Sequence, residues 1–416
     1  MPRRRLREQP ALFGSNLPPF TSTLDEIKRA VQQGAIHKGD LLMKIIISMR
    51  FDEIVKIIEQ IDYDKEDIYE RRAELNIDAA ALKRLDEADP PIEYPLYFAS
   101  PSYLVQHPEL VMYYRNVAML SRKVMRGIGL NTEAYEDQGR LLTEEIALEL
   151  SKHFNGIISK LVTIAGVTAN RHLEMALSNI GEALGGVSRN EVGRYASAQI
   201  LHYLITEWHK LGYLETIYYT LKPSLDIEKE EEEESEEDQQ PGVHLKLDVT
   251  PTTDIQSFLS YVSARRVKYQ EVTLRNGYHL LLDRQFYWAE SGEESKVHKI
   301  GVDMTSKSVR LDMEWGAEVK GGADPAGSDE HWKTATQALG RVLDAAEKTG
   351  RPKPNLSFIA TILVDRVAIE AQDWIDKGKL VSVYNLTKIS ENEAELRKFL
   401  DDVTKFLGYD LPGISK

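Results

Sequence analysis

A block of acidic residues divides this chain into two parts with different residue patterns. From Asp226 to Asp238 the sequence contains ten acidic residues and one lysine, and Pro241-Gly242 follows shortly after. A block of like charge repels itself and is usually a solvated linker or tail, and Pro-Gly interrupts regular structure. We therefore predict three regions: residues 1–225, an acidic linker at 226–241, and a second globular region at 242–416.

The same block accounts for most of the net charge. Lysine and arginine number 52 and aspartate and glutamate 66, so the formal charge is −14. Ten acids and one lysine contribute −9 of that total, which leaves −5 for the rest of the chain. A negative total would normally argue against nucleic acid as a partner. Here the uneven distribution removes that objection.

Residues 1–225 have the apolar periodicity of helices. Apolar residues recur at spacings of three and four, as they do on a helix with one buried face. Five segments follow this pattern: 25–33, 41–61, 108–125, 142–167 and 191–212. Asp89-Pro90-Pro91 and Gly185-Gly186 are expected to interrupt it. The first region is therefore predicted to be mostly helical.

Residues 242–416 alternate between strand and helix patterns. Strands are predicted at 243–249, 278–283, 299–304, 315–322, 356–364 and 380–387. Helices are predicted at 254–269, 329–350, 366–378 and 392–408. Such alternation indicates a mixed α/β domain around a central sheet. The predicted fold class is α+β, with a helical N-terminal region and a C-terminal mixed α/β domain.

Three absences narrow the kind of protein that this chain can be. The chain has no cysteine, so disulfides, thiol nucleophiles and cysteine zinc sites are excluded. No apolar run reaches the roughly 18 residues that a membrane span needs. The basic start at 1–7 is not followed by the apolar stretch of a secretory signal. We expect a soluble cytoplasmic protein with no membrane partner.

Three charged residues near position 310 form the most informative pattern. Asp303 ends a short apolar strand, and Glu318 and Lys320 lie fifteen and more residues later in another. Residues i and i+2 of a strand share one face, so Glu318 and Lys320 would project side by side. If the two strands pair as a hairpin, Asp303 lies near Glu318. Asp283 and Asp312 are alternative choices for the aspartate.

These residue types suit the cleavage of a phosphodiester bond. Two carboxylates at a sheet edge make a hard-oxygen site for Mg²⁺, with Asp303 and Glu318 as ligands. Lys320 can stabilise negative charge in the transition state or accept a proton. His331 is a second candidate base, because it stands near the start of a predicted helix whose dipole would lower its pKa. The choice between Lys320 and His331 is open at this point.

The segment at 318–335 adds a family resemblance. Its sequence, EVKGGADPAGSDEHWKTA, closely resembles the active-site segment of AvaI/BsoBI-type type II restriction endonucleases, which are PD-(D/E)XK nucleases. The resemblance implies that Glu318 and Lys320 are the Glu-x-Lys pair and that His331 is the histidine considered as general base. It also implies a DNA contact from Asp324, as acceptor from a cytosine amino group. Lys333 is a further candidate for a DNA contact.

The resemblance leads to an expected function. The chain would be a Mg²⁺-dependent, sequence-specific endonuclease of double-stranded DNA that acts as a homodimer, with residues 242–416 as a PD-(D/E)XK core. Residues 1–225 would bind DNA or form the dimer, and Arg115 and Arg122 could hold phosphates. Two alternatives stay open: a structure-selective or repair nuclease of the same superfamily, and a non-catalytic interaction protein with a nuclease-like core.

Overall fold

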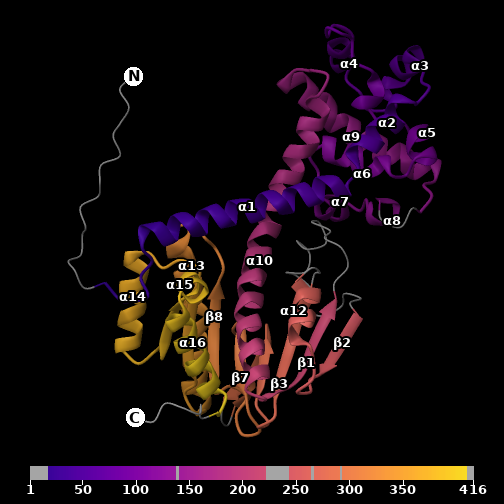
Figure 1. Cartoon of the computed structure of the whole chain (residues 1–416). Helices are drawn as coiled ribbons and strands as arrows, with labels where there is room; N and C mark the ends of the chain where they lie inside the picture. Colours follow the sequence, from indigo (N-terminus) through magenta and orange to yellow (C-terminus); the bar gives the residue numbers. More distant parts are fainter. Residues whose placement is uncertain (1–16, 137–139, 222–242, 264–266, 291–292, 410–416) are drawn as a thin grey trace, which may run out of the picture. The chain divides into compact units, whose positions relative to one another are not determined.

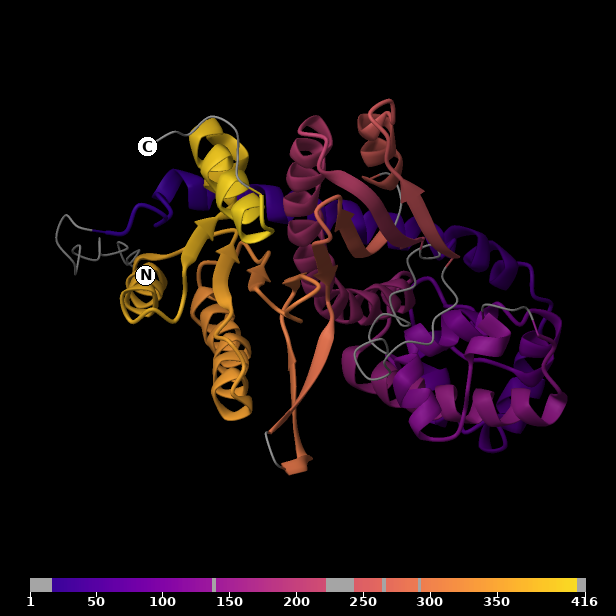
Figure 2. The same ribbon diagram turned by 90° about the horizontal axis from the view of Figure 1, so that it is seen from below.

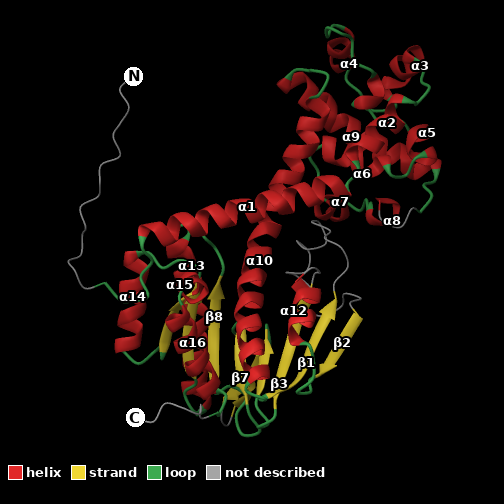
Figure 3. Cartoon of the chain, viewed as in Figure 1, coloured by secondary structure: helices red, strands yellow, loops and turns green. Residues whose placement is uncertain are grey.

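The fold is taken from a computed structural model, which describes residues 17–136, 140–221, 243–263, 267–290 and 293–409. These residues form two compact units. The helical unit comprises 38–188, and the sheet unit comprises 17–37, 189–221 and 243–409. Figure 3 shows helices in the first and a sheet with helices in the second, so the predicted α+β class is confirmed. The predicted acidic linker, 226–241, lies outside the described residues.

The first unit is helical and includes parts of the two longest helices of the described chain. The long helices are α1 (Leu24–Ser48) and α10 (Arg171–Lys210), each of which runs through both units. The others are α2 (Phe51–Glu59), α3 (Lys65–Glu70), η1 (Arg71–Ala73), α4 (Ala79–Asp86), η2 (Tyr94–Leu96), α5 (Pro101–Gln106), α6 (Leu110–Val117), α7 (Arg122–Gly127), α8 (Glu133–Glu136) and α9 (Glu144–Ala165). None of the helices in the described part of the chain has the length and apolar character that a membrane span requires.

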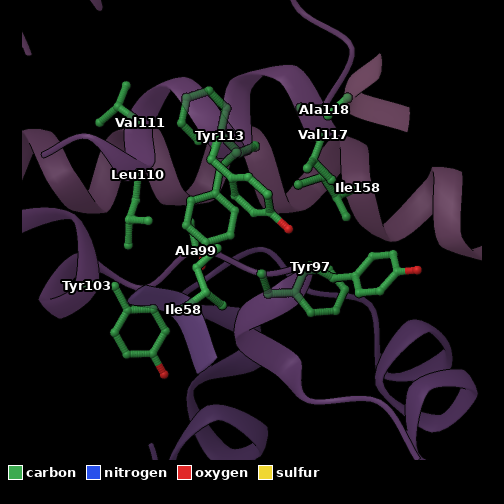
Figure 4. Packing of buried hydrophobic residues seen from close by; sticks show 14 of the residues in the cluster. Ile58, Tyr97, Ala99, Tyr103, Leu110, Val111, Tyr113, Val117, Ala118 and Ile158 are labelled. Carbon is green, nitrogen blue, oxygen red and sulfur yellow. The ribbon is translucent and has the colours of Figure 1, made fainter. Parts of the chain in front are cut away.

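Buried aromatic residues form much of the core of the helical unit. Tyr97, Tyr113 and Tyr114 are fully buried, and Figure 4 shows Tyr113 and Tyr97 among the aliphatic side chains of this core. A buried hydroxyl needs a hydrogen-bond partner. Tyr113 and Tyr114 donate to the backbone carbonyls of Leu96 and Pro95, at 2.8 and 2.6 Å. Their polar ends therefore fix the turn at η2 against α6.

The expected phosphate contacts of Arg115 and Arg122 need correction. Both arginines are buried, with Arg115 at 0% exposure and Arg122 at 5%. Both donate to the buried carboxylate of Glu136, at 2.7 and 2.9 Å from their Nε atoms. A buried charge is stable only when it is paired in this way. These guanidinium groups join α6, α7 and α8 inside the unit and do not face solvent.

The sheet unit contains an eight-stranded mixed sheet and a separate two-stranded hairpin. The strand order is β10-β9-β8-β7-β4-β3-β1-β2, with β8, β9 and β10 parallel and the other neighbours antiparallel. Its strands are β1 (Leu214–Leu221), β2 (Val243–Asp248), β3 (Val267–Leu274), β4 (His279–Leu282), β7 (Met304–Lys307), β8 (Trp315–Lys320), β9 (Asn355–Ala360) and β10 (Ser382–Asn385). The hairpin is β5 (Gln285–Glu290) and β6 (Glu293–Gly301).

Helices cover both faces of this sheet. Figure 2 shows α10, α12 (Ile255–Ser263) and α16 (Glu393–Phe406) on one face, and α13 (Ser328–Thr349), α14 (Asp365–Asp376) and the β5–β6 hairpin on the other. The short helix α15 (Leu386–Glu391) follows β10. Each face has its own apolar core. Trp315, Ala317 and Val319 of β8 belong to the α10 side, so Glu318 and Lys320 point to the α13 side.

The structure differs from the sequence-based elements in several places. Gly185-Gly186 does not end a helix, because α10 continues from Arg171 to Lys210. The predicted helix at 254–269 is shorter and is followed by β3. The segment at 214–221 is strand β1, between β2 and β3 in the sheet (Figure 1). The compact units thus divide at 37–38 and 188–189, whereas the sequence placed the first boundary at 225.

A substitution at Gly321, directly after β8, probes how tightly α10 packs against the sheet. A Cβ at Gly321 would lie 2.3 Å from the Val192 carbonyl oxygen in α10. We expect Gly321→Ala to lower the free energy of unfolding by about 2 kcal/mol, because backbone must move. A Cβ at Gly340 of α13 would have no neighbour within 4 Å. Gly340→Ala should therefore stabilise the protein by about 1 kcal/mol. Denaturant unfolding measures both, and equal effects would contradict this packing.

Candidate active site

The β7–β8 hairpin brings the predicted acidic residues together. Met304 of β7 pairs with Ala317 of β8, so Asp303, in the connection between β6 and β7, lies opposite Glu318. The backbone N–H of Val319 donates to Oδ2 of Asp303 at 2.6 Å. This hydrogen bond fixes the aspartate carboxylate against β8. The hairpin that the sequence pattern suggested therefore exists, with Asp303 at its open end.

Glu318 and Lys320 lie side by side on β8. The Lys320 Nζ atom donates to Oε1 of Glu318 at 2.7 Å. Glu318 is 7% exposed, and the side chain of Lys320 is 23% exposed. Val319, between them, points into the core on the other face of the sheet. The strand alternation thus delivers one carboxylate and one ammonium group to the same side.

A cavity of about 460 Å³ opens next to these residues. Three carboxylates line it: Asp283, Asp303 and Glu318. Three basic residues line it as well: Arg284, Lys299 and Arg341. The remaining lining residues are Gln285, Ile300, Gly301, Val302 and Ala338. A cavity with both signs of charge is suited to a ligand that carries negative charge and a counter-ion.

The structure separates the three candidate aspartates. Asp303 is held by Val319 and faces Glu318. Asp283 lines the same cavity, and its backbone N–H donates to the carbonyl oxygen of Asp303 at 3.0 Å. Asp312 is not among the lining residues and pairs with Arg351 at 3.0 Å. The geometry favours Asp303 as the partner of Glu318, with Asp283 next to the pair.

Burial and mutual repulsion disfavour the charged forms of the two acids. Burial, followed by the charge of Glu318, raises the pKa of Asp303 to about 7. Burial likewise raises the pKa of Glu318, although Lys320 and Arg341 act in the opposite direction. Burial lowers the pKa of Lys320, but the charges of Glu318 and Asp303 outweigh it, so the pKa is raised overall. Lys320 is therefore a firmly protonated cation.

His331 lies close to the backbone after β8. A Cβ at Gly322 would be 2.0 Å from Cε1 of His331, so only glycine leaves room for the imidazole there. Burial is the main cause that lowers the pKa of His331, and the charge of Lys320 lowers it further. The pKa of His331 is thus lowered, as the sequence predicted. The causes are burial and the charge of Lys320, whereas the prediction named the helix dipole. A neutral imidazole next to Lys320 can accept a proton.

Asp324 and Lys333 lie on segments beside this site. Oδ1 of Asp324 accepts from the backbone N–H of Ala326 at 3.0 Å, which closes the turn before α13. Lys333 has a side chain that is 65% exposed and lies 3.8 Å from Glu330. Their DNA contacts stay predictions.

The sequence patterns did not reveal the basic side of the cavity. Arg341 lies ten residues after His331 in α13, and Ala338 between them also lines the cavity. Spacings of three, seven and ten residues return to one face of a helix, so the signal was available from His331 onward. Arg284 and Lys299 had no such signal, because their place depends on how the β5–β6 hairpin leaves the sheet.

The acidic pair fits a divalent cation of the hard-oxygen type. Within the described residues, no group of three or more histidine, aspartate or glutamate side chains is arranged to hold a metal ion. Mg²⁺ does not require one, since it is commonly bound through one or two carboxylates together with water and substrate phosphate. The pKa values of both carboxylates are raised although the charge of Lys320 lowers each of them, so the negative charge of the pair is only partly compensated. A cation would supply the remaining compensation.

The raised pKa of Asp303 makes a prediction about stability. A folded-state pKa of about 7 exceeds the unfolded value of about 3.9. The metal-free protein should therefore lose stability as pH rises from about 4 to about 7, because the unfolded chain releases this proton first. Asp303→Asn removes that loss and can still accept from Val319. We expect it to raise the free energy of unfolding by ~4 kcal/mol at pH 8 and by little at pH 4.

Denaturant unfolding in EDTA at the two pH values measures this difference. Asp312→Asn, at an exposed ion pair outside the cavity, is the matched control. An increase in the free energy of unfolding that is the same at both pH values would contradict the claim that the buried charge of Asp303 causes the loss of stability.

Comparison with known proteins places this site in a recognised sequence segment. The family model of restriction endonuclease BsobI matches residues 302–400. The type II restriction enzyme BsoBI of Geobacillus stearothermophilus is 42% identical over 74 residues, which is 18% of this chain and 23% of that enzyme. The type II restriction enzyme AvaI of Nostoc sp. is 41% identical over 71 residues, 17% of this chain and 22% of that enzyme.

The chain therefore spans less than a quarter of the length of these relatives. The segment matched by the family model includes Asp303, Glu318, Lys320 and His331. It is the part of the chain that the sequence pattern singled out. The resemblance to AvaI/BsoBI-type restriction endonucleases is confirmed for residues 302–400 of this chain.

Proposed function

We propose that this protein is a type II restriction endonuclease that hydrolyses phosphodiester bonds of double-stranded DNA with Mg²⁺. One observation carries the proposal: Asp303 and Glu318 line one cavity, Lys320 bonds to Glu318, and all three residues lie within 302–400, the segment that the BsobI family model matches. These residue types are those of the PD-(D/E)XK core, to which we assign the sheet unit. The matched segment, 302–400, does not include the helical unit.

Asp303 and Glu318 would hold the metal ion. Both lie beside the cavity at β8, and the hydrogen bond from Val319 to Oδ2 of Asp303 leaves Oδ1 for another partner. Mg²⁺ bound there supplies a Lewis acid that neutralises charge on the phosphate. A cation held there would offset the burial and the repulsion from Glu318 that together raise the pKa of Asp303.

The other two residues have separate roles. Lys320 is protonated, and its ammonium group stands 2.7 Å from Glu318, so it is placed to stabilise negative charge that develops on a phosphate oxygen. His331 has a lowered pKa and is neutral near pH 7, so it can accept a proton from the attacking water. The electrostatics thus favour His331 over Lys320 as the general base.

We also propose the assembly and the setting of this activity. Cutting both strands of a palindromic site is most simply done by a two-fold symmetric homodimer. The helical unit would contribute to DNA binding or to the dimer. Restriction requires access to DNA in the cytoplasm, which is the compartment we assign. Asp324 and Lys333, on the turn and the helix that follow β8, are the proposed contacts to DNA.

Cleavage of a genome-sized DNA of known sequence tests the proposal. The wild-type chain with Mg²⁺ should give discrete fragments whose ends share one sequence. Glu318→Gln and Lys320→Met should each reduce the rate at least ~100-fold, because each removes a charge needed at the phosphate. Glu347→Gln, which changes an exposed carboxylate of α13 outside the cavity, should cut like wild type.

Three outcomes separate the alternatives. Undiminished cutting by Glu318→Gln and Lys320→Met would refute the assignment of the site. Cuts confined to junctions or flaps would identify a structure-selective nuclease of the same architecture. Failure of the wild-type chain to cut any duplex with Mg²⁺ or Mn²⁺ would favour a non-catalytic interaction protein.

A further inference from the structure

Two arginines on the basic side of the cavity have no described role. Arg284 stands in the short connection between β4 and β5, and Arg341 stands in the middle of α13. Both line the cavity that contains Asp303 and Glu318. We propose that Arg284 and Arg341 bind phosphate groups of the DNA backbone next to the carboxylate pair. This inference rests on the proposed nuclease function and specifies how the substrate is held.

Within the described residues, neither arginine has its charge paired at contact distance, although the charge of Arg341 lowers the pKa of Glu318. Both residues are exposed, and among the described residues no carboxylate forms an ion pair with either of them. Several other arginines of the sheet unit are paired with carboxylates. Arg29 bonds to Glu391, Arg351 to Asp312 and Arg366 to Asp329. Within the part of the chain that the structure describes, Arg284 and Arg341 form no such pair although three carboxylates line the same cavity.

Rigid elements hold the two arginines at fixed places. Arg341 is on the long helix α13, which packs against both β8 and the β5–β6 hairpin. Arg284 follows Asp283, whose backbone N–H bonds to the carbonyl oxygen of Asp303 at 3.0 Å. This backbone hydrogen bond joins the β4–β5 connection, which carries Arg284, to the β6–β7 connection, which carries Asp303. Both arginines reach the cavity from elements that are fixed relative to the acidic pair.

The chemistry of these groups selects a phosphate. A guanidinium group binds a phosphate through two parallel hydrogen bonds and stays charged at any working pH. The carboxylate pair repels an anion, so a polyanion approaches this cavity only if cations lie beside the pair. Arg284 and Arg341 meet that need from two elements, and Lys299 adds a third positive charge to the lining. A DNA backbone has a phosphate at each nucleotide, so each of the two arginines can bind a separate phosphate.

Salt dependence of DNA binding tests this proposal without catalysis. A duplex of about 30 base pairs is bound in EDTA over a series of KCl concentrations, with the full-length protein, and followed by fluorescence anisotropy. Arg284→Met and Arg341→Met should each weaken binding about tenfold and reduce the slope of log affinity against log salt by about one. The double variant should lose about two in slope, because each arginine releases its own counterions.

Two further variants separate a phosphate contact from a general effect. Arg341→Lys keeps the charge but not the paired hydrogen bonds, so it should restore the slope and only part of the affinity. Lys348→Met removes a positive charge from the exposed end of α13, outside the cavity, and should retain the wild-type slope. Circular dichroism and thermal unfolding check that all variants are folded.

The outcomes distinguish this proposal from the function on which it rests. If wild type binds the duplex and both methionine variants keep its salt slope, the arginine contacts are refuted and the nuclease proposal stands. If wild type does not bind duplex DNA at any salt concentration, both proposals are refuted.

Discussion

The electrostatic conflict between two neighbouring carboxylates is the constraint on which the rest of the site depends. Asp303 and Glu318 lie opposite each other at the open end of the β7–β8 hairpin, largely out of water and beside one protonated lysine. Such an arrangement costs stability, since burial favours the protonated form of each acid. The β7–β8 hairpin and the Val319 hydrogen bond keep the two side chains together. Conflict of this kind is typical of sites that bind a charged ligand.

The packing around β8 explains the residues that flank this pair. Trp315, Ala317 and Val319 anchor the strand in the core on the α10 side. Gly321 and Gly322 follow β8 and make room for other parts of the protein. The first leaves space for the α10 backbone and the second for the His331 ring. The glycines thus position protein groups, and the lining of the cavity is made by α13 and by the connections to β5–β6.

The sequence predicted the site better than it predicted the borders of the sheet. Strand alternation placed Glu318 and Lys320 together, and a fifteen-residue spacing suggested the hairpin that brings Asp303 to them. These are local relations, which short-range patterns record. Strand β1 was missed because it follows α10 directly and is identified by its pairing with β2 and β3, which are distant in sequence. Arg115 was misassigned for a similar reason, since its partner Glu136 comes from another helix.

Binding of a divalent cation to the acidic pair is the central claim, and electron paramagnetic resonance of Mn²⁺ tests it most directly. Titration of the full-length protein should show one Mn²⁺ bound per chain, competed by Mg²⁺. Glu318→Gln and Asp303→Asn should each abolish that site, whereas Asp312→Asn should leave it unchanged. Mn²⁺ binding that survives both changes at the acidic pair would contradict the account.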